Sequence, residues 1–150
     1  MRVLCLVFGV FVLGVAPAIA GTDVVFTGNV ADTCTLAVPT PGTMTLSGDG
    51  KTLGSDQSLG VPATVTVLSL GGNTVTLAAP TLTDSPPGYA GGETVQMSYS
   101  GLASHAYTTQ QQSFSLGIIP LTSLIINMQV INNAGFIQGT YKAKTVLTCS

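Results

Sequence analysis

Charged side chains are scarce in this chain. Its 150 residues include four Lys or Arg, six Asp or Glu and one His, with a formal net charge of -2. Only 7% are charged, against about 25% in an ordinary soluble domain. This composition gives nucleic acid and anionic membranes nothing to bind. Because little charge repulsion keeps copies apart, the surface is better suited to assembly than to free solution.

Catalytic and metal-binding patterns are also missing. His105 is the only histidine, in a polar stretch that we interpret as a solvated loop between strands. No G-x-S-x-G motif occurs, and the carboxylates are scattered over predicted turns, without the facing pair that a glycosidase needs. Two cysteines and one histidine do not make a four-ligand zinc set. We therefore predict a protein without catalytic residues, metal or cofactor, and not an enzyme; a secreted hydrolase is the least favoured class.

The first twenty residues have the pattern of a signal peptide. Arg2 is the only charge before Asp23, and an uncharged apolar run extends from 3 to 15. Residues 16–20 offer an A-x-A cleavage site. The run is shorter than the roughly 20 apolar residues of a membrane-spanning helix. We predict a signal peptide at 1–20, a single domain at 21–150, secretion, and no membrane span in the mature chain.

Two cysteines remain after the predicted cleavage. Cys34 and Cys149 lie near the two ends of the mature chain. In an exported protein two cysteines more often pair than stay free, although an intermolecular disulfide or two free thiols are alternatives. A bond between them would close a loop of a size that the chain-entropy model credits with about 4–5 kcal/mol.

Apolar residues recur at every second position, which is typical of β-strands. Segment 64–70 and segment 74–77 alternate in this way around Gly71-Gly72-Asn73, which predicts a hairpin. We predict seven or eight strands in an antiparallel β-sandwich, with a closed barrel as the alternative. One face of the N-terminal segment carries Val24, Phe26, Val30, Cys34, Leu36 and Val38. One face of the last strand, 140–149, carries Tyr141, Ala143, Leu147 and Cys149.

Two stretches carry a resemblance to a known family. VVFTGNVADTCTL begins at Val24, and GTYKAKTVLTCS begins at Gly139. Together they resemble the secreted subunits of the spore coat protein U and chaperone–usher pilin group. The resemblance implies an incomplete immunoglobulin-like sandwich, whose missing strand is supplied by the N-terminal extension of another subunit.

What the resemblance implies for function is a non-enzymatic structural subunit of a surface fibre or coat, with a role in cell adhesion. Its partners would be copies of itself or related subunits, with a periplasmic chaperone and an outer-membrane usher in transit to the cell surface or exterior. Segment 22–33 would be the donor. The donor side chains would be Val24, Phe26, Gly28 and Val30. The acceptor groove would be edged by Tyr141, Ala143, Thr145 and Leu147.

The cysteines depart from the family pattern. Members with a disulfide generally close it within the first half of the chain, whereas the only partner for Cys34 here is Cys149. Such a bond would either reinforce the acceptor site or accompany an N-terminal segment that folds back and completes its own domain. The alternative function is thus a self-contained secreted binding module, possibly for glycans. Its ligand would lie near the tyrosines, which are Tyr89, Tyr99, Tyr107 and Tyr141.

Overall fold

The computed structural model describes residues 25–29, 31 and 33–150, and this part of the chain is all-β, with antiparallel strands and no helix. The predicted signal peptide, Val24 and Val30 lie outside the described residues. Nothing described forms a helix long and apolar enough to cross a membrane. The strands are β1 (Thr33–Thr40), β2 (Thr45–Leu46), β3 (Thr52–Gly54), β4 (Ala63–Leu70), β5 (Thr74–Leu77), β6 (Thr81–Asp84), β7 (Thr94–Gly101), β8 (His105–Thr108), β9 (Gln112–Ser115), β10 (Ile119–Ile131), β11 (Lys142–Lys144) and β12 (Leu147–Cys149).

The larger sheet is organised around the long strand β10. The first half of β10 pairs with β4, which in turn pairs with β1 at the edge. The second half pairs with β7 on one side and with β3 on the other, and β2 and β8 extend these two sides. β1 thus has one partner strand in the described structure, and its other edge is open.

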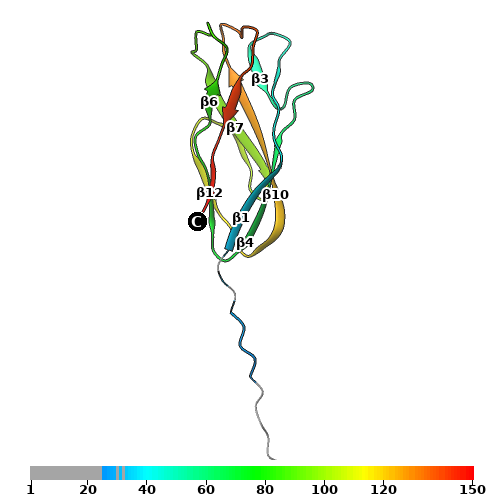
Figure 1. Ribbon diagram of the computed structural model, residues 1–150, viewed down its shortest axis with the longest axis vertical. Coiled ribbons are helices and arrows are strands. Elements are labelled where there is room, and N and C mark those ends of the chain that lie inside the picture. Colours follow the sequence, from blue (N-terminus) through cyan, green and yellow to red (C-terminus); the bar gives the residue numbers. More distant parts are fainter. Residues whose placement is uncertain (1–24, 30, 32) are drawn as a thin grey trace, which may run out of the picture.

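The opposite layer is built from short strands that follow one another along the chain. β5 pairs with β9 on one side and with β12 on the other, while β6 pairs with β11. The last two strands, β11 and β12, therefore run antiparallel to β5 and β6 and form an edge of this layer (Figure 1).

The core lies between the layers and is made of the inward residues of alternating strands. β4 buries Val65 and Val67, and β5 buries Val75 and Leu77, as their period-two pattern predicts. Further core side chains come from β7, β10 and the residue after β9: Met97, Tyr99, Leu124, Ile126 and Leu116. These two inner faces make the β-sandwich predicted from the sequence.

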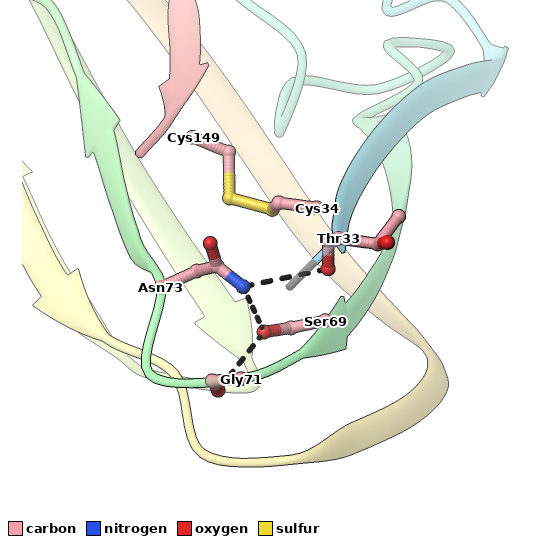
Figure 2. Close-up of a disulfide and its surroundings, with 6 residues drawn as sticks. All are labelled: Thr33, Cys34, Ser69, Gly71, Asn73 and Cys149. Carbon is pink, nitrogen blue, oxygen red and sulfur yellow. Dashed lines mark hydrogen bonds between the residues drawn. A yellow bond between two sulfur atoms is a disulfide. The ribbon is translucent and has the colours of Figure 1, made fainter. Parts of the chain in front are cut away.

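The predicted hairpin between 64–70 and 74–77 is wrong. β4 and β5 do not pair; the turn between them carries the chain from one layer to the other. Asn73, only 7% exposed, holds this crossing, since its amide donates to Ser69 Oγ at 2.9 Å and to the Thr33 carbonyl at 3.4 Å (Figure 2). The inward side chains of both strands are apolar. They cover one another when the two strands lie in facing layers, whereas in a hairpin they would lie side by side on the same face.

Three other expectations differ from the structure. The long predicted strands are divided, so the described chain has twelve strands rather than seven or eight. The alternation of Phe114, Leu116 and Ile118 predicts that all three point inward, but Ile118 is 79% exposed because β9 ends at Ser115. His105 begins β8 instead of lying in a loop, although it is exposed as expected.

Candidate functional site

The most distinctive feature of the surface is an apolar groove between the two layers. It has a volume of about 790 Å³ and runs between β1 with the segment after it on one side, and residues 139–147 on the other. Its walls are the two open edges, because β1 pairs with β4 alone and β11 and β12 pair with β6 and β5 alone. The walls run antiparallel, since the start of β1 faces the end of β12.

The floor of the groove is the hydrophobic core. Val65 and Ile126, which are core residues of the larger sheet, line it together with the half-buried Met128. Leu53 and Ala63 complete the apolar floor. Leaving such side chains uncovered costs free energy, because burying apolar surface stabilises a protein by about 25 cal/mol for each Å² removed from water.

The first wall contains residues that strand alternation turns inward but that nothing covers. Val38 follows Cys34 and Leu36 on the same face, and these two are half-buried, whereas Val38 is 57% exposed and lines the groove. The wall continues beyond β1 with Pro41, Gly42, Thr43 and Met44. The exposure of Val38 therefore marks the part of this face that is left uncovered in the described structure.

The second wall holds all four residues predicted for the acceptor strand. Tyr141, Ala143, Thr145 and Leu147 line the groove and are half-buried. Lys142 and Lys144 line it as well but are exposed, and Val146 is exposed outside the lining. The backbone alternates in the same way, because the amide of Ala78 bonds to the carbonyl of Val146 and Ser150 exchanges two bonds with Thr74. The amides of odd-numbered residues 147 and 149 therefore point away from β5, toward the open edge.

A disulfide closes one end of the groove. Cys34 of β1 and Cys149 of β12 are bonded, with their Cα atoms 6.1 Å apart, which confirms the pairing expected from the sequence and makes it intramolecular (Figure 2). Neither cysteine lines the groove, since both pack against the core beyond it. Beside them the amide of Asn73 fixes the start of β1, so the closed end is braced by a covalent bond and by hydrogen bonds.

Tyr141, which lines the other end of the groove, belongs to an aromatic cluster. The rings of Tyr89, Phe136 and Tyr141 lie within 5.1–6.0 Å of one another. The Tyr89 hydroxyl accepts a hydrogen bond from Asn132 at 2.7 Å, and burial raises the pKa of this tyrosine. The Tyr141 hydroxyl donates to the Ile137 carbonyl at 3.0 Å and accepts from the Ile137 amide at 3.1 Å. Tyr141 is thus fixed at this rim by both its ring and its hydroxyl.

The predicted donor segment lies outside the sandwich where it is described. Residues 25–29 are not in a strand, and Figure 1 shows them trailing from the end at which β1 begins. Phe26 is 91% exposed and Gly28 is also exposed. A phenylalanine on an extended segment exposes most of its apolar surface, for which burial against a partner is the favourable outcome.

The features considered for other functions are dispersed. Tyr99 is buried in the core, and Tyr89 and Tyr141 belong to the aromatic cluster, so the four tyrosines do not form one platform. In the described part of the chain no group of three His, Cys, Asp or Glu side chains could hold a metal ion. In the same part of the chain, one ion pair joins Lys142 of β11 to Asp84 of β6 at 3.3 Å.

Sequence reasoning found the second wall of the groove and missed the first wall and the floor. Ile126 and Met128 share the period-two face of one strand, but this pattern does not show that they lie under an opening. The available signal is the apolar Val38, which is in phase with Cys34 and Leu36 and is followed by Pro39 and Pro41.

Comparison with known proteins adds no relative: no family model, no curated protein and no solved structure matches this chain.

Proposed function

We propose that this protein is an exported, non-enzymatic structural subunit that assembles into a surface fibre or coat by β-strand complementation. The N-terminal segment of one copy fills the apolar groove of the next. The observation that carries the proposal is the groove itself, about 790 Å³ in volume, with a core floor and two unpaired strand edges as walls. Such edges pair readily with an added strand, whose main chain supplies the hydrogen bonds and whose alternate side chains fill the floor.

The donor and the groove agree in length and period. Tyr141 and Leu147 are six residues apart, and so are Val24 and Val30. As a fully extended strand, either stretch would span about 20 Å at 3.4 Å a residue. Each also offers a residue to the interface at every second position. Phe26, which is 91% exposed, is the largest of the donor side chains and would contribute most of the buried apolar area.

The low charge of the chain fits this assembly, because only 7% of residues carry charge that would repel neighbouring copies. In transit, a periplasmic chaperone would cover the groove and an usher would exchange it for the donor. This role follows the resemblance to the spore coat protein U and pilin group, and the chain would then reach the cell surface with adhesion as a consequence of the fibre.

Gel electrophoresis of purified protein without boiling and without reductant tests the proposal. Contacts made by a whole row of backbone bonds survive cold detergent, so we expect a ladder that collapses to one band on boiling. The variant Phe26→Asp should lose the ladder, because a carboxylate would have to enter an apolar groove. The control Thr27→Asp, which changes the opposite face of the same segment, should keep it. A ladder that only reductant removes, or one that Phe26→Asp keeps, would contradict the proposal.

A further inference from the structure

We infer that the Cys34–Cys149 disulfide prevents each chain from filling its groove with its own N-terminal segment, so that the occupant is a second copy of this chain. The inference rests on the proposed function. The proposed function places the segment of one copy in the groove of the next, and this inference adds the reason why the chain's own segment does not take that place.

The disulfide lies between the N-terminal segment and the groove. The segment joins β1 at Thr33, one residue before Cys34, and the groove begins further along β1, where Val38 is its first lining residue. Figure 1 shows residues 25–29 leaving at this same end of the sandwich. A chain that turned back on itself would therefore meet the closed end of its groove first.

No strand fits between the two cysteines. Their Cα atoms are 6.1 Å apart, whereas a strand inserted between two others needs about 9.5 Å, or twice the spacing of neighbouring strands. A tight hairpin would have to begin its pairing along the open edge of β1 next to Cys34, and Cys149 already occupies that position. The hydrogen bonds from Asn73 to Thr33 and Ser69 hold the start of β1 and the end of β4 in place, so this end does not simply widen (Figure 2).

A detour around the disulfide is too long for the segment. Val38 lies five residues beyond Thr33, so the returning chain must cover about 17 Å outside the groove before it enters, in addition to the turn. This consumes five or more residues immediately before Thr33, which include Val30 and Gly28. Phe26 would then reach only the first part of the groove, and the match of six-residue lengths would be lost.

A second copy meets no such obstacle. Its segment can enter at the opposite end, between residues 41–43 and 139–141, which are exposed apart from the half-buried Tyr141. The donor's N-terminus then points toward the disulfide, and the donor runs antiparallel to β11 and β12. In this direction the backbone N–H and C=O groups of the odd-numbered residues in the second wall can form antiparallel hydrogen bonds with the donor.

The decisive experiment lengthens the connection and leaves the disulfide intact. A flexible Gly/Ser linker of about 15 residues, inserted between Asp32 and Thr33, has a root-mean-square span of roughly 21 Å and reaches much further when extended. The chain can then pass around to the open end of its own groove and insert in the same direction as a second copy. We expect the unboiled ladder to be replaced by a monomer whose N-terminal segment resists limited proteolysis.

The control is the same linker with Phe26→Asp, which should give a monomer whose segment is cleaved as readily as that of the diluted wild-type protein. Two results would overturn the inference: a linker variant that forms the wild-type ladder, or a diluted wild-type monomer whose segment is already protected.

A peptide separates this inference from the proposed function. A synthetic peptide of residues 21–32 is added to the Phe26→Asp protein, whose own segment cannot fill the groove. If the peptide does not bind, the groove is not a strand acceptor and both proposals are wrong. If it binds while the linker variant still assembles, the groove accepts strands, but the disulfide does not decide which chain supplies them.

Discussion

Gly139 and Tyr141 belong to the stretch that resembles the pilin group, and they shape the end of the groove opposite the disulfide. Gly139 has a φ of 153°, which side chains rarely adopt, and a Cβ atom there would lie 2.8 Å from Pro86 Cγ. Two residues later the ring of Tyr141 packs against Phe136. The glycine therefore lets the chain pass Pro86 closely enough for Tyr141 to reach its cluster.

We expect Gly139→Ala to lower the free energy of unfolding by about 1–3 kcal/mol, the usual cost of a strained backbone position. Gly72→Ala is the matched control, since its Cβ would meet nothing within 4 Å, and should change stability by less than about 0.5 kcal/mol. Urea unfolding measures both. Equal stability of the two variants would show that Pro86 does not constrain this rim.

Tyr107 makes stability depend on alkaline pH. Burial, together with the nearby carboxyl group of Asp56, raises the pKa of its phenol from 10.0 to about 12. Between these pH values the folded protein keeps a proton that the unfolded chain loses, so the free energy of unfolding falls as pH rises. Tyr107→Phe should lack this part of the decline, in unfolding measured at pH 9 and pH 11. A variant with the same slope as the wild type would place the titrating group elsewhere.

At the scale of elements, the local sequence predicted which face of a strand is buried better than it predicted which strands pair. The alternation of β4 and β5 correctly gave Val65, Val67, Val75 and Leu77 as inward residues. It could not show that the turn at Gly71 and Asn73 connects two layers, because a hairpin and a crossing between layers need the same turn residues and the same alternation. The bond from Asn73 to Ser69 distinguishes them, and it exists only in the folded chain.

The open edge at β12 predicts an alternating pattern of amide hydrogen exchange. Hydrogen bonds join Val146 to Ala78 and Ser150 to Thr74, and the pair of Thr148 and Thr76 lies between them. The amide of Thr148 therefore faces β5, whereas the amide of Leu147 faces the groove. In the Phe26→Asp monomer we expect Leu147 to exchange quickly and Thr148 slowly. On binding the peptide of residues 21–32, the exchange of Leu147 should slow by about tenfold or more, with little change at Thr148.

The pattern would be contradicted if Leu147 and Thr148 exchanged alike in the monomer, which would mean that another segment already pairs with this edge. A peptide that slowed neither amide while still binding would place its site away from β12.

At the scale of the whole molecule, the sequence predicted the class of fold and one side of the candidate site. Period-two alternation indicated antiparallel sheets, and the resemblance to the pilin group implied the acceptor face of residues 141–147. The groove could not be derived in this way. Its floor comes from β3, β4 and β10, and its other wall from β1 and residues 41–44, which only the packing of the layers brings together.

The disulfide shows the same limit. Two cysteines in an exported chain indicated a bond, yet its effect depends on where the N-terminal segment leaves the sandwich. The resulting account is of a molecule with a complete core at one end, an uncovered core along its groove, and an exposed apolar segment that its own covalent closure keeps out.

The measurement that tests this account most directly is cysteine cross-linking between two variants. Protein with Phe26→Cys is mixed with protein carrying Ala143→Cys or Thr145→Cys in the groove wall, and non-reducing gels report the mixed dimer. We expect this dimer with at least one groove cysteine and not with Val146→Cys, because Val146 is 51% exposed and does not line the groove. Cross-linking at Val146 as efficient as in the groove, or none at either groove position, would contradict strand exchange between copies.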